Sequence, residues 1–287
     1  MRPFPTEAFM AQGKVCLAAD VSAVAMTPDL GAEVRGVDLS APLSDACFAR
    51  ILQIFHRYGV IYLRSQALDA RLLARFAARF GESELTPVEE QPLPGLPQVS
   101  VLGDSVQGGL EPSYWHSDRS HEVVPPAVTL LYGMNGADGG SAEFVNMYSV
   151  FNALAPEKQL LVQKLRGLHV ARALDPAAGL PETAGAQRQG AEHPLVRVHP
   201  ETGKRALYLA KEVVARAAGL REDDSRKLIE QLEAFATQPR FVYAHRWRKG
   251  DLLIWDNRCT LHRMSFEPRS DRALYRIRVR GETPIAG

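Results

Sequence analysis

A series of short strand-like segments, spread over residues 98–280 without regular strand–helix alternation, limits the folds open to this chain. Each segment is rich in β-branched, aromatic or leucine residues, and turn-forming residues separate many of them. They are QVSVLG (98–103), PAVTLLYG (126–133), SAEFVNM (141–147), HPLVRVH (193–199), RALYLA (205–210), GDLLIWDN (250–257) and RALYRIRVR (272–280). Many short strands with helices outside them predict a mainly β fold, a sandwich or jelly roll with helical additions. A doubly wound sheet would need regular strand–helix alternation and an early glycine-rich loop, and the sequence has neither.

Two amphipathic helices and a strand precede this β-rich part. Residues 44–59 predict a helix that Ser44 caps, and GVIYLR (59–64) predicts a buried strand. Residues 68–81 predict a second helix, which Gly81 ends. The apolar stripes of the two helices are Phe48, Ile51, Leu52 and Phe55, and Leu68, Leu72, Leu73, Phe76 and Phe80.

Two further helices are predicted within the β-rich part, at about 156–166 and at 224–236, the latter capped by Asp223 or Asp224. Between them, residues 172–192 form a long polar segment without periodicity, which predicts a lid loop.

The length of 287 residues is enough for one large domain, and we expect an N-terminal arm over 1–27 and a single domain over 28–287. The net charge of +1 gives no reason to expect a nucleic acid or a membrane as partner. The cysteines at 16, 47 and 259 are widely spaced and form no CxxC pair, which favours a reducing compartment. With no signal-peptide pattern at the N-terminus, a cytoplasmic location is expected.

The stretch YWHSDRSH (114–121) holds a candidate metal site. In an extended segment, His116 and Asp118 point to the same face, about 7 Å apart by strand rise. His262, in WDNRCTLHR directly after a predicted strand, is the best candidate for a third ligand. Two histidines and one carboxylate with open positions form the facial triad of non-heme iron(II) oxygenases. The alternative is a loop whose polar side chains cap a helix or a turn.

The last predicted strand carries several arginines on one face. Arg272, Arg276, Arg278 and Arg280 alternate with Ala273, Tyr275, Ile277 and Val279. Either this is the exposed face of an edge strand, or Arg272 and Arg276 point into a barrel. A buried guanidinium requires an anionic partner, such as a bound carboxylate. A protein carboxylate from residues 84–113 is an alternative partner for Arg276.

Several blocks, in order, give the chain a family resemblance. It resembles the taurine/2,4-dichlorophenoxyacetate dioxygenases, which depend on iron(II) and 2-oxoglutarate, from about residue 28 to 284. The blocks are GAEVRGVDLSAPLSD, YGVIYLRSQALD, WHSDRSHEVVPPAVTLLYG, GGSAEFVNMYSVFNAL, HPLVRVHPETGKRALYL and WRKGDLLIWDNRCTLHR. The resemblance implies a double-stranded β-helix, a jelly roll, with helices around it.

Carried over by position, the resemblance implies that His116, Asp118 and His262 bind iron(II). It implies that Arg272 binds the distal carboxylate of the cosubstrate 2-oxoglutarate and that Arg276 holds a substrate anion.

Two positions depart from the family pattern. The family usually has threonine after GGx, where its hydroxyl helps to hold 2-oxoglutarate, and this chain has Ala142 there. Ser141 is a candidate substitute for that hydroxyl. Three residues after Asp118, where phenylalanine is common, stands His121, a candidate pocket residue.

The implied reaction consumes O2 and 2-oxoglutarate, gives succinate and CO2, and hydroxylates a C–H bond, with C–X cleavage where that carbon bears a heteroatom. Expected substrates are sulfonates, sulfate esters, aryloxyalkanoates or amino-acid-like carboxylates. The alternatives are a catalytically altered jelly-roll binding protein and a zinc hydrolase, for which no general base is evident. The resemblance also implies a homodimer or homotetramer.

Overall fold

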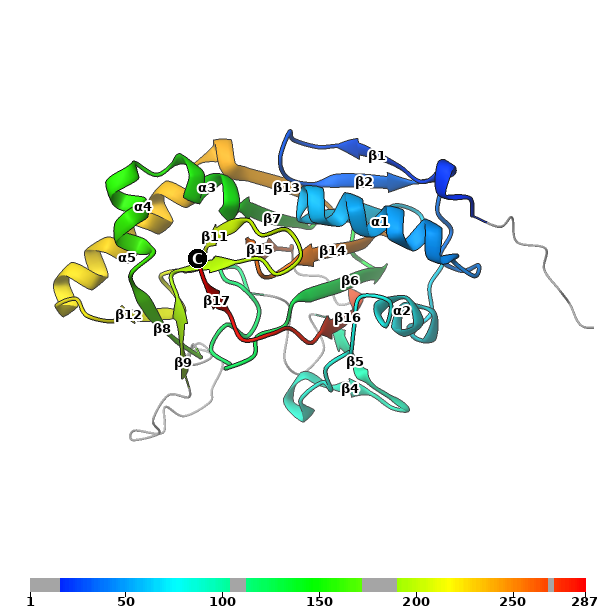
Figure 1. Ribbon diagram of the computed structural model, residues 1–287. Helices are drawn as coiled ribbons and strands as arrows, with labels where there is room; N and C mark the ends of the chain where they lie inside the picture. Colours follow the sequence, from blue (N-terminus) through cyan, green and yellow to red (C-terminus); the bar gives the residue numbers. More distant parts are fainter. Residues whose placement is uncertain (1–15, 104–111, 172–189, 268–270) are drawn as a thin grey trace, which may run out of the picture.

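The computed structural model describes residues 16–103, 112–171, 190–267 and 271–287, and in it two β-sheets face each other with helices outside them (Figure 1). The larger sheet has eight strands in the order β1-β2-β3-β14-β6-β16-β5-β4. Its strands are β1 (Ser22–Ala25), β2 (Ala32–Arg35), β3 (Val60–Leu63), β14 (Leu252–Asp256), β6 (Val128–Asn135), β16 (Ala273–Val279), β5 (Leu96–Leu102) and β4 (Pro92–Leu93). Neighbouring strands are antiparallel except β2 and β3, which are parallel.

The facing sheet has the order β13-β7-β15, and the described residues form two other small sheets. Its strands are β13 (Val242–Arg246), β7 (Ser141–Asn146) and β15 (Thr260–Ser265). The other two sheets are β12-β8-β9 and β11-β10-β17, formed by β8 (Arg166–Val170), β9 (Gly190–Pro194), β10 (Val196–Val198), β11 (Arg205–Leu207), β12 (Val214–Ala217) and β17 (Ile285–Ala286).

The α-helices of the described residues lie outside the sheets (Figure 1). They are α1 (Asp45–Tyr58), α2 (Ala70–Ala77), α3 (Met147–Ala153), α4 (Pro156–Val162) and α5 (Glu222–Ala236), with 3-10 turns η1 (Ala18–Asp20), η2 (Val88–Glu90) and η4 (Pro239–Phe241). None of the helices in this part of the chain is long and apolar enough to cross a membrane.

Helix α1 begins and ends where the sequence predicts. The Ser44 side chain accepts a hydrogen bond from the backbone N–H of Cys47 at 3.2 Å, which satisfies a donor that the helix leaves unpaired. Gly59 ends the helix in the left-handed conformation, at φ 66°. The predicted strand that follows is confirmed as β3, whose four residues are buried.

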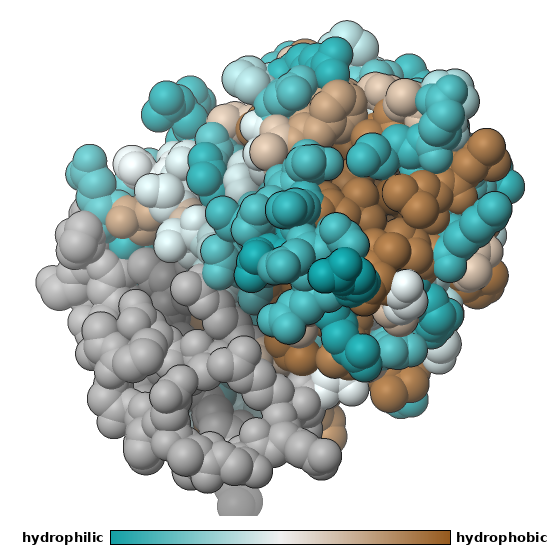
Figure 2. All heavy atoms as spheres, turned by 90° about the vertical axis from the view of Figure 1, so that its left-hand side faces the viewer, coloured by the Kyte–Doolittle hydropathy of each residue, from teal (hydrophilic) through white to brown (hydrophobic). Residues whose placement is uncertain are grey.

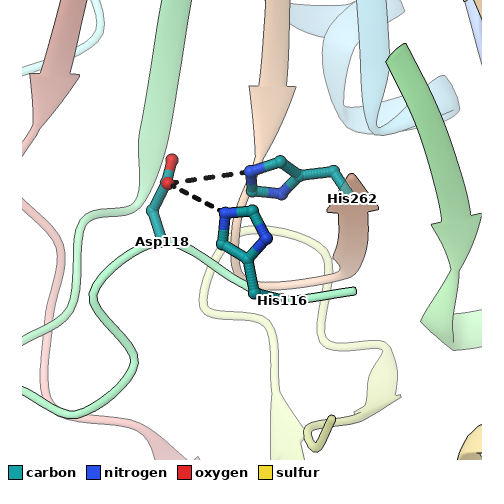
Figure 3. Close-up of side chains that lie close together, drawn as sticks. All are labelled: His116, Asp118 and His262. Atoms are coloured by element: carbon teal, nitrogen blue, oxygen red, sulfur yellow. Dashed lines mark ion pairs between the residues drawn. The ribbon is translucent and has the colours of Figure 1, made fainter. Parts of the chain in front are cut away.

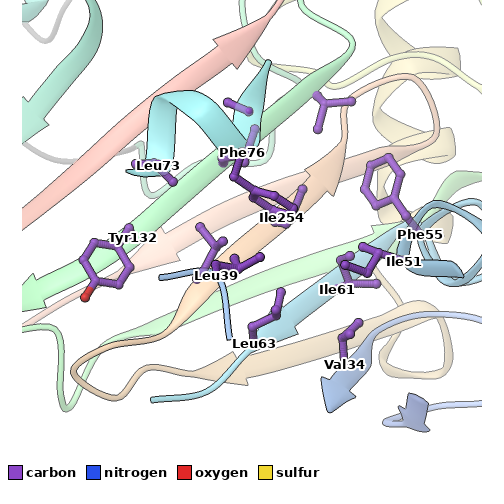
Figure 4. Packing of buried hydrophobic residues seen from close by; sticks show 14 of the residues in the cluster. Val34, Leu39, Ile51, Phe55, Ile61, Leu63, Leu73, Phe76, Tyr132 and Ile254 are labelled. Carbon is purple, nitrogen blue, oxygen red and sulfur yellow. The ribbon is translucent and has the colours of Figure 1, made fainter. Parts of the chain in front are cut away.

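The large sheet separates two cores. One lies between the sheet and α1 and α2, where aromatic and aliphatic side chains of the helices pack on the outer face of the sheet (Figure 4). The other lies between the two facing sheets and includes Leu131, Leu253, Trp255 and Leu274 on one side, and Phe144, Tyr243 and Met264 on the other. Residues of β6, β14 and β16 that point inward thus face β7, β13 and β15.

Several predicted boundaries are wrong. The helix expected over 68–81 is α2, which runs only over Ala70–Ala77 with Ala78 as its C-cap, so Gly81 does not end it. The single strand expected over 193–199 is two strands, β9 and β10, in different sheets, because β9 pairs with β8 whereas β10 pairs with β11 and β17. The helix expected over 156–166 ends at Val162, and residue 166 already begins β8.

Helix α5 starts earlier than expected, and neither predicted cap is its cap. Its N-cap is Arg221, which makes no side-chain capping hydrogen bond. Asp223 and Asp224 lie inside the first turn, where their charges favour the positive end of the helix dipole.

Strand β1 lies within the segment expected to be an arm, and it pairs with β2 at the edge of the large sheet. Of the predicted lid over 172–192, residues 172–189 lie outside the described residues, and the remainder opens β9.

The end of the molecule where α4 and α5 lie presents hydrophobic areas bordered by hydrophilic side chains (Figure 2). Leu160 and Leu161 of α4 are among the exposed large hydrophobic residues.

Candidate metal centre

The three predicted metal ligands meet between the sheets. The Nε2 atoms of His116 and His262 lie 3.8 and 3.6 Å from Oδ1 of Asp118 (Figure 3). All three side chains are buried, and one ligand atom from each lies within 4.8 Å of the others. The prediction that they come together is confirmed, and the alternative of a capping loop is wrong.

Direct backbone pairing fixes the two histidines relative to each other. His262 lies on β15, and the extended segment at His116 forms an isolated antiparallel bridge with it. The His116 N–H donates to the His262 carbonyl at 3.0 Å, and the His262 N–H donates back at 2.8 Å. Nδ1 of His116 lies 3.0 Å from the Tyr114 carbonyl, which selects the tautomer with the proton on Nδ1 and the lone pair on Nε2.

Asp118 is oriented by two residues that the sequence analysis missed, Thr129 of β6 and Asn257. The Thr129 hydroxyl donates to Oδ2 of Asp118 at 2.5 Å, and the Asn257 amide donates to that hydroxyl at 2.8 Å. Oδ1 of Asn257 accepts from the Asp118 N–H at 3.3 Å and from Nε1 of Trp255 at 3.0 Å. The Ser117 hydroxyl donates to the Asn257 carbonyl at 2.7 Å. The only sequence signal was the position of Asn257 five residues before His262.

The Asp118 carboxylate is held ionised. Burial by itself would raise its pKa, but the His262 imidazole and the Arg278 guanidinium lower that pKa well below the usual range. Nη2 of Arg278 lies 3.9 Å from Oδ1 of Asp118.

The donor set fits a divalent transition metal. Both ring nitrogens of His262 are buried and have no hydrogen-bond partner among the described residues, which is costly unless a ligand such as a metal binds there. Two imidazoles and one carboxylate on one side of an ion leave further coordination positions open, as in non-heme iron(II) oxygenases.

The predicted cosubstrate residues lie near the start of β7. Ser141 is half-buried and Ala142 is buried. The Phe266 ring packs against Gly140, where a Cβ atom would lie 2.1 Å from it, so only glycine fits. The Arg272 guanidinium stacks on that ring, 4.5 Å from its centre.

Arg272 itself is buried and directly precedes β16. Its Nε donates to the Gly136 carbonyl at 3.1 Å and its Nη2 to the Glu267 carbonyl at 2.5 Å. Strand β16 lies between β6 and β5, so the alternative of an exposed edge strand is wrong.

Arg276 is buried on β16 and forms an ion pair with Glu90. Nη1 of Arg278, two residues on, lies 2.7 Å from the same Oε2 atom of Glu90. Arg276 thus has a protein carboxylate from residues 84–113 as a partner, which was the alternative that the sequence left open.

His121 is half-buried close to the arginines. The pKa of His121 is lowered, mainly by burial. The Glu122 carboxylate opposes this shift, and the positive charges of Arg119 and Arg278 add to it.

A second group with ligand-type atoms, His199, Asp256 and Cys259, has less to offer a metal. Arg258 already donates from Nε and Nη2 to the two Asp256 oxygens, at 2.9 and 2.8 Å, and His199 Nε2 lies 2.9 Å from Oδ2. The Asp256 charge is therefore neutralised by a guanidinium, and we interpret this group as a structural ion-pair network.

Comparison with known proteins gives consistent matches over most of the chain. The family model "Taurine catabolism dioxygenase TauD, TfdA family" matches residues 22–278. The chain is 32% identical over 256 residues to the alpha-ketoglutarate-dependent 2,4-dichlorophenoxyacetate dioxygenase of Cupriavidus pinatubonensis, covering 82% of this chain and 89% of the relative. It is 32% identical over 272 residues to the alpha-ketoglutarate-dependent sulfate ester dioxygenase of Pseudomonas putida, covering 89% and 88%. A solved taurine dioxygenase from Burkholderia xenovorans has a TM-score of 0.81 and 31% identity, covering 93% of this chain and 91% of that one.

Proposed function

Since the chain belongs to the TauD/TfdA dioxygenase family, we propose that it hydroxylates a C–H bond of a small organic anion bound beside Arg276. The family resemblance predicted from the sequence blocks is confirmed, and the chain is an iron(II)- and 2-oxoglutarate-dependent dioxygenase. A catalytically altered binding protein is not favoured, because His116, Asp118 and His262 are all present and converge.

His116, Asp118 and His262 would hold iron(II), which with 2-oxoglutarate supplies the oxidising chemistry from O2. The role of the protein is to keep the three ligands on one side and to leave the opposite positions open. Thr129 and Asn257 hold the Asp118 carboxylate in place before any ion binds.

We assign the cosubstrate's distal carboxylate to Arg272. Its guanidinium is buried over the Phe266 ring and donates to the Gly136 and Glu267 carbonyls, so its orientation is fixed, which suits a carboxylate. Ser141 is the nearest hydroxyl in sequence to the position where the family usually has threonine, and Ala142 leaves that position without a donor.

We assign the substrate's anionic group to Arg276. The main support for this assignment is that Arg276 is buried and that its neighbour Arg278 lies 3.9 Å from the ligand Asp118. The two guanidinium groups therefore lie beside the metal centre. The relatives named above act on 2,4-dichlorophenoxyacetate and on sulfate esters, both anions. Sulfonates, sulfate esters, aryloxyalkanoates and amino-acid-like carboxylates are the candidate classes, and His121 is the proposed pocket residue near Arg278.

Other parts of this proposal concern architecture and assembly. We infer that the two facing sheets form the jelly roll, or double-stranded β-helix, and that the chain is one domain. A cytoplasmic location and a homodimer or homotetramer stay predictions, and sedimentation of the purified protein measures the latter.

The test is turnover of matched anionic and neutral substrates. Succinate formation is measured with iron(II) and 2-oxoglutarate for phenoxyacetate, 2-phenylethanesulfonate and hexyl sulfate, and for 2-phenoxyethanol as the neutral analogue. Wild type should prefer the anions, and Arg276→Leu should lose that preference through a higher KM. Equal turnover of neutral and anionic compounds by the wild type would refute the assignment.

A further inference from the structure

We propose that Glu90 is an internal carboxylate that occupies an anion subsite formed by Arg276 and Arg278 together, and that the substrate's anionic group displaces it. The inference rests on the proposed function, because it concerns the same Arg276 subsite. It adds a second arginine to that subsite and assigns to Glu90 a direct effect on substrate affinity.

The two arginines are spaced to share one anion. Arg276 and Arg278 are two residues apart on β16, so both side chains leave the same face of the strand, about 7 Å apart at their backbones. Both guanidinium groups converge on one oxygen, Oε2 of Glu90. A carboxylate bound between two guanidinium groups is the geometry that a substrate carboxylate, sulfonate or sulfate would need.

The pair lies beside the metal centre and next to a hollow at the surface. Arg278 approaches Asp118 to 3.9 Å. Arg276 and Arg278 line a small cleft with Ser100 and Arg119. This cleft, of about 10 Å³, adjoins a hollow of about 460 Å³ at the surface through the shared residues Glu84, Leu85 and Arg119.

The Glu90 carboxylate forms its ion pairs from a short, exposed turn. Glu90 ends the short turn η2, whose first residue, Val88, is 82% exposed and contributes little burial. The next residue, Gln91, has φ 52°, a left-handed conformation that is unfavourable for a residue with a Cβ atom. The Glu90 side chain is 28% exposed, against 6% for Arg276 and 11% for Arg278. The carboxylate can therefore leave toward solvent, while the arginines cannot.

Electrostatics explains why a protein carboxylate occupies the subsite when no substrate is bound. Two buried guanidinium groups without an anion would be destabilising, so the empty site needs a counter-charge. Burial raises the pKa of Glu90, but Arg276 and Arg278 lower it below its usual value, so the carboxylate is ionised at neutral pH. A bound substrate anion would pair with Arg276 and Arg278 in place of Glu90. Because the Glu90 ion pairs must break first, the protein binds the substrate less tightly than it would without Glu90.

The experiment compares Glu90→Gln with the wild type. Binding of phenoxyacetate, 2-phenylethanesulfonate and hexyl sulfate is measured by calorimetry, alongside the KM of each and the melting temperature. Removing the competing charge should lower the Kd and KM of the tightest-binding anion roughly tenfold, the scale of one charge-assisted hydrogen bond. Binding of neutral 2-phenoxyethanol should not change.

Glu122→Gln is the matched control. Glu122 is a carboxylate on the same rim, but its ion pair is with Arg119, at 2.7 Å. If anion affinity rises equally in Glu122→Gln, the effect is a change in overall charge and the proposal fails. For the second arginine, Arg278→Lys should weaken anion binding while leaving 2-phenoxyethanol binding unchanged.

Two failures are distinguishable. If Arg276→Leu removes the preference for anions but Glu90→Gln binds them no more tightly than the wild type, Glu90 is a permanent structural partner and only this inference is wrong. If none of the three anions binds to Glu90→Gln, or if Arg276→Leu keeps the full preference for anions, the subsite itself is misplaced, and the proposed function fails with it.

Discussion

Replacing Thr129 with valine tests whether the polar network behind Asp118 prepares the metal site. The substitution removes one hydroxyl and keeps the shape of the side chain, which is buried in β6. That hydroxyl donates to Oδ2 of Asp118 at 2.5 Å and accepts from the Asn257 amide at 2.8 Å. Valine therefore leaves a buried carboxylate oxygen and a buried amide each short of one partner.

The size of the effect follows from these two contacts. A hydrogen bond to a charged group contributes about 1.5–3 kcal/mol and a neutral one about 0.5–1.5 kcal/mol, so unfolding should become easier by roughly 2–4 kcal/mol. Since Asp118 loses its fixed orientation, affinity for the metal should fall about 10- to 100-fold, as is typical for groups that orient metal ligands. Fe(II) binding under anaerobic conditions, followed by calorimetry, measures this directly, and chemical denaturation measures the stability.

Thr260→Val is the control. The Thr260 hydroxyl is also buried, but it donates to the Asp256 carbonyl at 2.7 Å and does not orient Asp118. This variant should lose stability without a comparable loss of metal affinity. Wild-type metal affinity in Thr129→Val would refute the idea that this network prepares the site.

Three further predictions concern the cosubstrate and pH. Arg272→Ala should raise the KM for 2-oxoglutarate at least ~10-fold by removing a charge-assisted contact, while Fe(II) affinity stays near wild type; loss of iron affinity alone would contradict the assigned role. Ala142→Thr should lower the Kd for 2-oxoglutarate, measured by calorimetry, if the added hydroxyl reaches the carboxylate as in the family pattern; weaker binding would argue against that placement. Burial, then His193 and Arg197, lowers the pKa of His169 well below its usual value, so the folded protein keeps it neutral. The unfolded chain takes up that proton below about pH 6.5, so stability falls as the pH drops through that region, and His169→Phe should make the melting temperature less sensitive between pH 6.5 and 5. An unchanged pH slope would show that His169 does not contribute.

Local patterns in the sequence were sufficient for the features that depend on near neighbours. Ser44 and Gly59 mark the ends of α1 because capping and left-handed backbone are properties of single positions. The alternation along 272–280 correctly predicted that Arg276 and Arg278 share one face, since side chains of a strand alternate between faces wherever the strand lies. Whether that face was exposed or pointed inward was left open by the sequence. His116 and Asp118 share a face for the same reason. His262 was chosen from its position after a predicted strand, and the family blocks agreed with that choice.

Contacts between distant segments were decided only by the tertiary structure. Thr129 and Asn257 have no motif of their own, and they become partners of Asp118 because β6 and the end of β14 pair side by side. The division of 193–199 into β9 and β10 depends on which strands lie beside each half, and periodicity cannot report that.

Glu90 is the clearest case of this limit. The sequence could name residues 84–113 as a source of a carboxylate for Arg276, but it could not choose among its acidic residues. That choice is made when β4 and β5 pair at the edge of the sheet next to β16, which brings the end of η2 over the two arginines. An ion pair between groups far apart in the chain depends on the distance between them in the fold, and the sequence specifies that distance only through the whole packed structure.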